Sequence, residues 1–357
     1  MISRAVCEDV FRAAVAACDP TAPVREAVAR LVPLERAVIG FAVGKAALAM
    51  ARAAGPVARG IVVAPQLDGG LLPMGWTARD AAHPLPDERS VAAGAAVLEL
   101  VQSAEPDELV LALISGGASS LIEQPTVPLA LYREHIAEVM ASGVPIGRLN
   151  EVRTSLSNLK GGKLARASRA PMVTLAVSDV IGDDPVVIGS GPTTPGSRYQ
   201  VVMPMRSFFH AACAELERRR IVLPEQNEPL RGLIELLAPA LERGIYWGEP
   251  TVVVPAEHGS GGRAQQLALA LAAQIAGTDQ SAFVVGSDGI DGPAPPGRRA
   301  PAGAYVDGTT WAAIEAAGLD PADALNRRDA GTALAAVDAL VITGPTGINH
   351  ADLVIIG

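Results

Sequence analysis

The chain has 357 residues, 49% of them apolar, and carries a formal net charge of −9 at pH 7. This length exceeds one ordinary hydrophobic core, so two domains are expected. The acidic balance, without a basic stripe carrying interleaved aromatic residues, argues against nucleic acid as a partner. No apolar run reaches the roughly 18 residues that span a membrane. The three cysteines form no pairing motif, so a cytoplasmic protein without a membrane partner is expected.

Apolar segments alternate with helical patterns over the first 200 residues. Helices are expected over 8–17 and 46–54. Continuous aliphatic runs predict strands at 36–43, 60–65, 108–114 and 172–177. Because these runs show no polar alternation, they predict a parallel sheet covered by helices on both faces. Loops after the strands would then meet at the carboxyl edge of the sheet, where such folds bind ligands.

The second half of the chain begins with a less regular segment, 201–248, which is rich in Pro, Arg and Glu and is expected to connect two domains. The alternation then restarts, with a helix over 263–276 and strands at 251–254, 282–285, 339–342 and 353–356. The predicted fold class is therefore α/β with two domains. A larger Rossmann-like, doubly wound parallel sheet is expected over 1–200, and a smaller α/β domain over 249–357.

Only three residues are lysine, and each lies in a glycine-containing segment: Lys45, Lys160 and Lys163. An ammonium on a flexible stem can follow a phosphate, and glycine lets the backbone approach a ligand. The segment from Gly40 to Lys45 is not a Walker loop, because it has one residue too few between its glycines and no Ser or Thr after the lysine. Lys45 is expected to serve another phosphate geometry; the alternative is a solvated surface lysine.

Two loops of glycine and serine follow predicted strands, at 115–120 and 259–262. Their backbone N–H groups and hydroxyls could hold an anion, and the helix expected after each would add a positive dipole end. Arg263 opens the second of these helices. The alternative is a tight turn that only joins strand to helix. The candidate anion ligands of the first loop are Ser115, Gly116, Gly117, Ser119 and Ser120.

Acidic residues follow two predicted strands: Asp179, Asp183 and Asp184 after one, Asp288 and Asp291 after another. Carboxylates at strand ends can hold Mg²⁺ between phosphate oxygens, or accept a proton from an attacking hydroxyl. The alternative for any single one is an ordinary turn aspartate beside glycine. A site of this kind is expected because both loops carry several carboxylates.

Other chemistries find less support in the sequence. The histidines show no pair at zinc-ligand spacing, and His83 is expected to be a turn residue. No Gly-x-Ser-x-Gly elbow predicts a serine hydrolase. No Gly-x-Gly-x-x-Gly follows the first strand, which disfavours a nicotinamide dehydrogenase.

Taken in order, a series of segments resembles the glycerate 2-kinase family with a C-terminal MOFRL domain. They are Val43–Ala46, His83–Asp87, Leu113–Ser119, Asn150–Arg153, Leu156–Leu164, Val177–Pro185, Ser190–Thr193, Gly261–Arg263, Asp288–Gly292 and Thr343–Thr346. The resemblance covers nearly the whole chain. It implies a two-domain α/β kinase that uses ATP and Mg²⁺ to phosphorylate the 2-hydroxyl of D-glycerate.

On this resemblance, Lys45 and Arg263 would neutralise the transferred phosphoryl group. Asp179 would accept the proton or bind the metal ion, with Asp183 and Asp184 as further metal ligands. Arg153 would bind a substrate carboxylate. The other residues expected to bind phosphate or substrate are Lys160, Gly161, Gly162, Glu257, Asp288 and Thr343.

Two segments depart from the family's pattern. Val254–Glu257 stands where the family has Ser-Gly-Gly-Glu, and Gly261–Gln266 stands where it has Gly-Gly-Arg-Asn-Gln-Glu. The acceptor therefore stays open between D-glycerate, or a related hydroxy acid, and a cyclitol, carbasugar or sugar phosphate. A non-catalytic phosphosugar-binding protein is a second alternative, and a dehydrogenase ranks third. Homodimer formation stays open as well.

Overall fold

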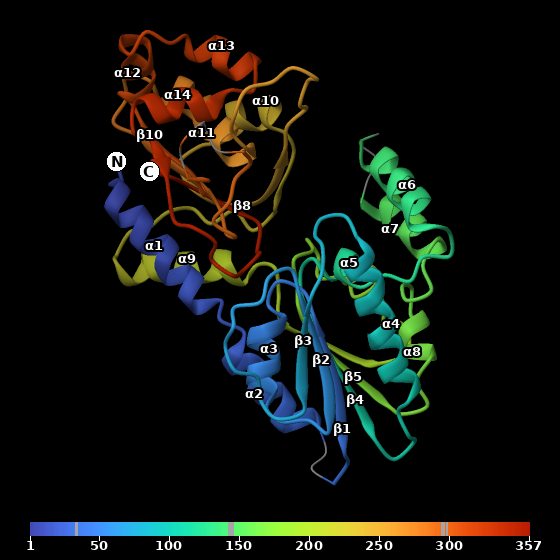
Figure 1. Ribbon diagram of the computed structural model, residues 1–357. Helices are drawn as coiled ribbons and strands as arrows, with labels where there is room; N and C mark the ends of the chain where they lie inside the picture. Colours follow the sequence, from blue (N-terminus) through green and yellow to red (C-terminus); the bar gives the residue numbers. More distant parts are fainter. Residues whose placement is uncertain (33–34, 142–145, 294–296, 298) are drawn as a thin grey trace. The chain divides into compact units, whose positions relative to one another are not determined.

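The computed structural model describes residues 1–32, 35–141, 146–293, 297 and 299–357. These residues form two compact units (Figure 1). The N-terminal unit is Asp19–Met205, and the C-terminal unit combines Met1–Cys18 with Arg206–Gly357. Within the described ranges no helix is both long and apolar enough to cross a lipid bilayer.

The N-terminal unit is built on a six-stranded sheet in which all neighbouring strands are parallel. Its strands are β1 (Val38–Val43), β2 (Arg59–Ala64), β3 (Trp76–Asp80), β4 (Leu109–Ile114), β5 (Met172–Val177) and β6 (Arg198–Met203). Their spatial order, β3-β2-β1-β4-β5-β6, is that of the doubly wound Rossmann fold. The predicted parallel sheet is confirmed, and the strand order reverses between β1 and β4.

Helices cover both faces of this sheet (Figure 1). α2 (Thr21–Leu31) and α3 (Ala47–Ala54) pack on one face; α4 (Glu88–Gln102) and α8 (Lys163–Arg166) pack on the other. Alternate residues of each strand face opposite sides, so Ile39, Phe41 and Val43 contact the α4 side. The remaining helices are α5 (Ala118–Leu121), α6 (Leu129–Ala141) and α7 (Ile146–Ser155). α6 and α7 pack around a small core of their own centred on Tyr132.

The C-terminal unit contains a second six-stranded sheet, in the order β11-β10-β9-β12-β8-β7. Its strands are β7 (Leu230–Leu233), β8 (Gly244–Thr251), β9 (Ser281–Gly286), β10 (Gly303–Asp307), β11 (Leu340–Val341) and β12 (Asp352–Ile356). Only the β7–β8 pair is parallel among the described pairs; the other neighbours are antiparallel. The predicted second α/β unit is confirmed, with a mixed sheet.

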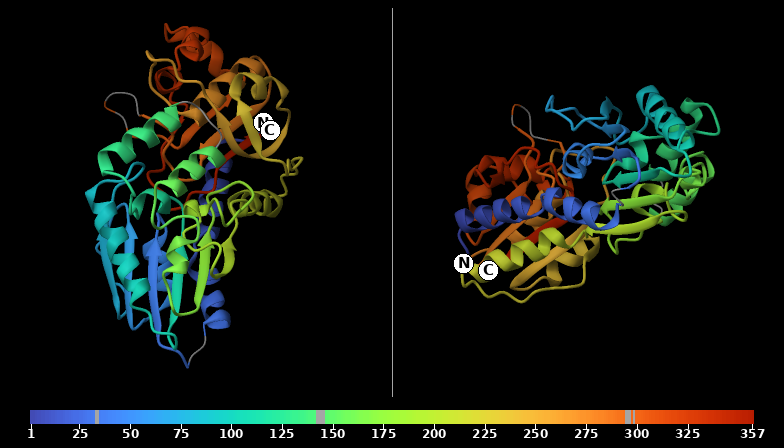
Figure 2. Two further views of the ribbon diagram at one scale, coloured as in Figure 1. Left: turned by 90° about the vertical axis from the view of Figure 1, so that its right-hand side faces the viewer. Right: turned by 90° about the horizontal axis from the view of Figure 1, so that it is seen from below.

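Helices also cover both faces of the second sheet. The buried helix α11 (Arg263–Ile275) lies against one face together with α10 (Ile234–Leu237), α12 (Thr310–Ala316), α13 (Pro321–Asn326) and α14 (Ala330–Ala336). α1 (Arg4–Ala17) and α9 (Ser207–Arg218) lie side by side and cover the other face (Figure 2). The ring of Phe11 in α1 packs edge-on against Phe208 of α9 and Phe283 of β9.

The structure differs from the expectation at two points in the division of the chain and in the position of one strand. The first helix belongs to the C-terminal unit, because its apolar face is buried against α9 and the second sheet. The expected connecting region, 201–248, holds α9, β7 and most of β8 and is part of the same unit. The strand expected at 251–254 is wrong, because β8 covers Gly244–Thr251 and the exposed residues Val253 and Val254 lie beyond it.

Candidate active site

The loops that follow β1 and β4 are joined by backbone hydrogen bonds. The N–H of Lys45 donates to the carbonyl of Gly116 at 2.8 Å, and the N–H of Ala46 donates to Ser115 Oγ at 3.0 Å. Gly44 has a φ of +129° and would clash with Ser115 if it carried a side chain. Glycine is therefore required at this contact. The two loops lie where the strand order reverses, which is the position at which such sheets bind ligands.

Three side chains gather on the glycine loop. A Cβ atom on Gly116 would lie 2.5 Å from Asp179 Oδ2. A Cβ atom on Gly117 would lie 3.0 Å from His83 Cδ2 and 3.7 Å from Lys45 Cγ. Lys45 and Asp179, both predicted site residues, thus lie beside adjacent glycines of one loop.

His83, which the sequence analysis expected to be a turn residue, lies beside the glycine loop. Burial lowers the pKa of its imidazole, and the nearby cations Lys45 and Arg153 lower that pKa further. The imidazole is therefore neutral at neutral pH and can accept or donate a hydrogen bond. Its place in the segment 83–87, which resembles the kinase family, was the only sequence signal for this role.

The serines of the loop make hydrogen bonds inside the protein. Ser119 Oγ lies 2.6 Å from Ser190 Oγ, which donates to Asn150 Oδ1 at 3.0 Å. Ser120 Oγ donates to the Gly117 carbonyl at 3.2 Å. The helix after the loop, α5, has four residues, so few peptide dipoles add up at its N-terminus. The capacity to hold an anion therefore depends on the glycines and on Lys45 more than on a helix dipole.

Lys160 lies in the interior of the N-terminal unit, with 1% of its surface exposed. Its Nζ atom is 2.5 Å from Glu123 Oε2 and 3.3 Å from the Ile122 carbonyl. Glu123 also accepts hydrogen bonds from the hydroxyls of Tyr132, at 2.5 Å, and Ser157. Burial lowers the pKa of Lys160, and Glu123 opposes this shift. The ammonium expected to bind phosphate has a carboxylate partner of its own.

The glycines after Lys160 are also engaged by protein groups. The N–H groups of Gly161 and Gly162 donate to the carbonyls of Ser190 and Gly191 at 3.1 and 2.7 Å. Lys163 Nζ donates to two carbonyls near the C-terminal end of α7, where a cation is favourable. The segment 160–163, which was expected to bind phosphate, therefore connects the C-terminal end of α7 with residues 190–191 through hydrogen bonds.

Two of the predicted metal ligands accept backbone hydrogen bonds, Asp183 from a distant residue and Asp184 within a turn. Asp183 Oδ1 accepts the N–H of Met205 at 2.8 Å, and Asp184 Oδ1 accepts the N–H of Val186 at 2.9 Å. No group of three or more His, Cys, Asp or Glu side chains among the described residues is arranged to hold a metal ion. Mg²⁺ in kinases is commonly held by one or two carboxylates together with substrate phosphates. Asp179, which contacts the glycine loop, fits that requirement.

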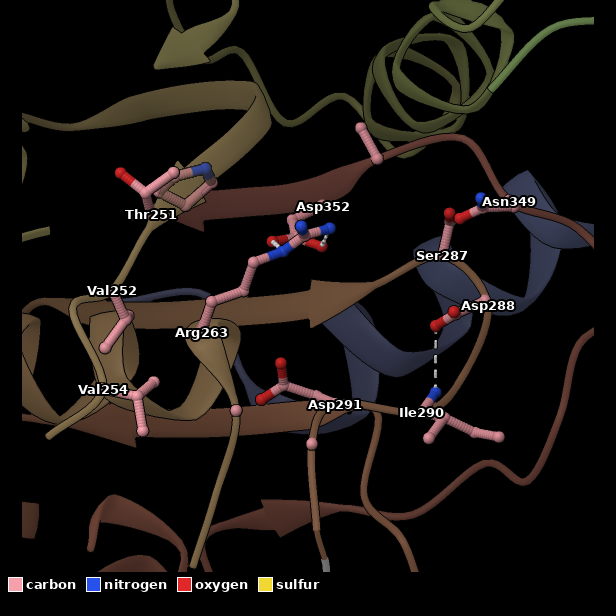
Figure 3. Close-up of a pocket in the computed structure, with 14 residues that line it drawn as sticks. Thr251, Val252, Val254, Arg263, Ser287, Asp288, Ile290, Asp291, Asn349 and Asp352 are labelled. Atoms are coloured by element: carbon pink, nitrogen blue, oxygen red, sulfur yellow. Dashed lines mark hydrogen bonds and ion pairs between the residues drawn. The ribbon is translucent and has the colours of Figure 1, made fainter. Parts of the chain in front are cut away.

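The C-terminal unit contains a cavity of about 510 Å³ where β8 and β9 end and β12 begins (Figure 3). Charged and polar residues of β12, α11 and the loop after β9 line it together with short apolar side chains. The lining residues are Pro250, Thr251, Val252, Val254, Gly262, Arg263, Ser287, Asp288, Ile290, Asp291, Gly292, Asn349, Ala351 and Asp352. The predicted residues Arg263 and Asp288 therefore face one cavity.

Two carboxylates bind Arg263 at the wall of this cavity, Asp352, which Figure 3 shows, and Glu249. Its Nε and Nη2 atoms lie 2.6 and 3.0 Å from the two oxygens of Asp352, and Nη2 lies 3.2 Å from Glu249 Oε1. Burial alone lowers the pKa of the guanidinium, but Asp352 and Glu249 raise it, and the net pKa is higher than usual. Burial raises the pKa of Asp352 to about 7, although Arg263 opposes the shift.

The N-terminus of α11 is closed by a carboxylate. Asp291 accepts the N–H groups of Ala264 and Gln265 at 3.0 and 2.8 Å, and the Gln265 side chain donates to it as well. Asp291 thus satisfies two N–H groups in the first turn of the helix that was expected to add a positive dipole end to the loop at 259–262. Asp291 therefore caps the N-terminus of α11, a role that the sequence analysis did not give it.

The last predicted residues of the C-terminal unit lie on loops. Asp288 Oδ1 accepts the N–H of Ile290 at 3.1 Å, as the dashed line in Figure 3 shows. Thr343 is exposed and donates to the Gly344 carbonyl at 2.9 Å. Glu257 is exposed and is absent from the residues that line the cavity. Only Asp288 of these three borders the cavity.

Comparison with known families divides the chain much as the structure does. A model described as a domain of unknown function, DUF4147, matches residues 6–210, and the MOFRL family model matches residues 244–352. The second match begins inside the region expected to be a connection, in agreement with the course of β8.

Several known proteins are similar over nearly the whole chain. A D-glycerate 2-kinase of Thermotoga maritima is 31% identical over 97% of this chain and 96% of its own length. A protein of Agrobacterium vitis with the provisional name hydroxypyruvate reductase is 33% identical over 98% of this chain and 93% of its own length. The crystal structure of a glycerate kinase from Thermotoga maritima has a TM-score of 0.83, 29% identity and 98% coverage of both chains. The chain therefore belongs to the glycerate 2-kinase family with a C-terminal MOFRL domain, a family of kinases.

Proposed function

We propose that this protein is an ATP- and Mg²⁺-dependent kinase that phosphorylates a hydroxyl of D-glycerate or a related hydroxy acid. The observation that carries the proposal is the junction of the β1 and β4 loops, where Lys45, His83 and Asp179 gather on Gly116 and Gly117. Phosphoryl transfer depends mainly on positioning and on neutralising charge on the phosphate oxygens. The Lys45 cation can neutralise this charge, and the glycine backbone beside it can position the phosphate.

The proposal assigns a chemical role to each residue, and Asp179 has two. The Lys45 ammonium neutralises the transferred phosphoryl group, and the glycine backbone lets its oxygens approach. Asp179 accepts the proton of the attacking hydroxyl as the new oxygen–phosphorus bond forms. Arg153 binds the carboxylate of the acceptor, since a guanidinium matches that planar group. The Mg²⁺ ion, when bound, neutralises the phosphate oxygens of ATP, and Asp179 is the carboxylate that would contact it.

Further parts of the proposal concern location and the C-terminal unit. Cys7, Cys18 and Cys213 are all free and buried, which suits the reducing cytoplasm that the ATP requirement also implies. Arg263 provides the second phosphate-directed cation, on the wall of the cavity that Asp288 also lines.

The direct test measures ADP release by the purified protein with ATP, Mg²⁺ and a panel of acceptors. The panel contains D-glycerate, other hydroxy acids, cyclitols, carbasugars and sugar phosphates. Turnover with D-glycerate above all others is expected. A neutral cyclitol as the best acceptor would keep the kinase and replace the acceptor. No turnover with any acceptor, together with ATP binding by calorimetry, would leave a non-catalytic binding protein.

Replacing Lys45 tests the role of the glycine loop. Lys45→Ala is expected to lower kcat by about 10²–10³-fold, the effect of losing one preorganised group that stabilises transition-state charge. Arg52→Ala is the control, because Arg52 is a cation of the neighbouring helix α3 that pairs with Asp68 at the surface. Full activity of the Lys45→Ala protein would contradict the proposal.

The provisional name of the Agrobacterium vitis relative raises a second candidate function, reduction of hydroxypyruvate. The chain lacks the glycine fingerprint that binds a dinucleotide after the first strand. Oxidation of NADH or NADPH in the presence of hydroxypyruvate, without ADP formation from ATP, would favour the reductase over the kinase.

A further inference from the structure

Arg263 is the one basic side chain among the described residues that line the cavity of the C-terminal unit. Three carboxylates line the same cavity, Asp288, Asp291 and Asp352. Asp291 is committed to the N-terminus of α11. Asp352 instead joins the strand β12 to Arg263, the cation that faces the cavity.

The two carboxylate contacts hold one edge of the guanidinium. Asp352 accepts from Nε and Nη2, and Glu249 accepts from the same Nη2. Among the described residues none accepts a hydrogen bond from Nη1. A guanidinium has five N–H donors in a fixed plane, so fixing one edge also fixes the direction of the opposite donors. About 38% of the Arg263 side chain remains exposed.

All three residues of this contact lie on regular secondary structure, which sets the positions of their backbones. Asp352 is the first residue of β12, a strand paired on both sides with β8 and β9, and its side chain is 3% exposed. Glu249 lies on the adjacent strand β8, and Arg263 is the first residue of α11. In Figure 3 the Arg263 side chain extends from the start of its helix to Asp352. A carboxylate on a central strand thus sets the orientation of a long, otherwise flexible side chain.

Stability alone does not explain this arrangement. A buried ion pair is often no more stabilising than apolar residues of the same volume. We propose that Asp352, supported by Glu249, is the positioning residue of Arg263, holding its Nε–Nη2 edge so that Nη1 points to an oxygen of the phosphoryl group. The inference rests on the proposed kinase activity. It assigns a role to Asp352, which the sequence motifs had not singled out, and explains why this residue carries a carboxylate.

The first test replaces Asp352 by asparagine. The amide keeps the size of the side chain but presents an NH₂ group to the N–H donors of Arg263, so the bidentate pair is lost. kcat is expected to fall by up to about 10²-fold, as misplacement of a catalytic group by about 1 Å does, while the KM for the acceptor changes little. Asp323→Asn is the matched control, because Asp323 pairs with Arg327 in the same unit with both side chains more than half exposed. It is expected to keep wild-type kcat.

A double-mutant cycle separates positioning from a general structural role. If Asp352 acts through Arg263, Asp352→Asn lowers kcat in the wild-type protein but has no further effect in Arg263→Ala. The inference would be overturned if the fold losses in kcat of the two single variants multiplied in the double variant. Wild-type kcat in Asp352→Asn would overturn it as well. Should Asp352→Asn fail to fold by circular dichroism, Glu249→Gln replaces it in the same cycle under the same criteria. Glu249 is 40% exposed, so its replacement leaves the core intact.

Failure of the proposed kinase function would be recognised separately. If the wild-type protein turns over no acceptor, the cycle is measured as the affinity for Mg²⁺–pyrophosphate by calorimetry. Weaker binding by Asp352→Asn, with no added loss in Arg263→Ala, would support the positioning role without the kinase. Unchanged pyrophosphate affinity in both single variants would overturn it.

Discussion

At the scale of single residues, the three lysines have different roles although their sequence context is alike. Each lies in a glycine-containing segment, which suggested phosphate contact for all. Lys45 lies on the glycine loop beside His83. Lys160 is buried against Glu123, and Lys163 caps the end of α7. The difference arises from burial, because a lysine enclosed in the core requires a carboxylate partner before it can serve any ligand.

Replacing Lys160 tests this assignment. Lys160→Met would leave Glu123 as a buried charge supported by two hydroxyls and the N–H of Gln124, without its ammonium partner. The free energy of unfolding is therefore expected to fall by about 3 kcal/mol. Urea unfolding followed by the fluorescence of Trp76, which packs on Gly40 and Gly60 of the first sheet, measures it. Adding Glu123→Gln should restore part of the loss, because it removes the unpaired charge.

The control for this prediction is an exposed pair in the same unit. Arg148 and Glu151 form an ion pair with both side chains 66% exposed. Glu151→Gln is expected to change stability by less than about 0.5 kcal/mol. Unchanged stability of Lys160→Met, with a raised KM for ATP, would instead restore the phosphate role that the sequence suggested.

The residues of the candidate site were predictable to different degrees. Lys45 and Asp179 could be found from the sequence, because each follows an aliphatic strand in a loop that contains or adjoins glycine. His83 and Asp352 could not be assigned this way. Their roles depend on neighbours more than 30 residues away in sequence, Gly117 for one and Arg263 for the other. No local pattern encodes a contact of that range.

At the scale of elements, α11 shows how a helix end is satisfied by a distant loop. Its N-cap residue, Gly262, has no side chain to offer, and Asp291 supplies the carboxylate instead. The glycine is needed there because a Cβ atom would clash with Asp291. The sequence Gly261-Gly262-Arg263 therefore serves a close contact between loop and helix, as well as any ligand.

Asp291→Ala is expected to destabilise the C-terminal unit by about 1–2 kcal/mol, the usual cost of a lost N-cap. The measurement is urea unfolding of a Trp76→Phe background, in which Trp247 and Trp311 report on the C-terminal unit alone. Asp87→Ala serves as the control, since Asp87 caps α4 in the N-terminal unit. That variant should leave this signal unchanged, and an equal shift from both variants would contradict the assignment.

At the scale of the whole molecule, the C-terminal unit is assembled from both ends of the chain. Met1–Cys18 packs with Arg206–Gly357, and the two termini lie side by side in both views of Figure 2. Ser281 makes the contact specific: its hydroxyl bonds the backbone of Ile2, and its carbonyl accepts the N–H of Gly357. The second unit is thus discontinuous in sequence.

Removing residues 1–18 is expected to destabilise the C-terminal unit and to leave the N-terminal unit nearly unchanged. The deletion exposes the apolar face of α9 and the face of β9 that Phe11 covers. Urea unfolding read from Trp247 and Trp311 should shift to lower urea, while the signal of Trp76 should not. A shift in Trp76 alone would show that α1 supports the other unit.

The sequence by itself determined the class of the fold and the family. Aliphatic runs without polar alternation indicate a sheet buried on both faces, and this period is a local property of the chain. The tertiary structure alone decided the strand order around β1 and β4, the mixed second sheet and the packing of α1 with the distant segment Arg206–Gly357. It also decided which charges face a cavity and which are paired in the core. Burial and pairing depend on residues far apart in sequence, so no run of neighbouring residues specifies them.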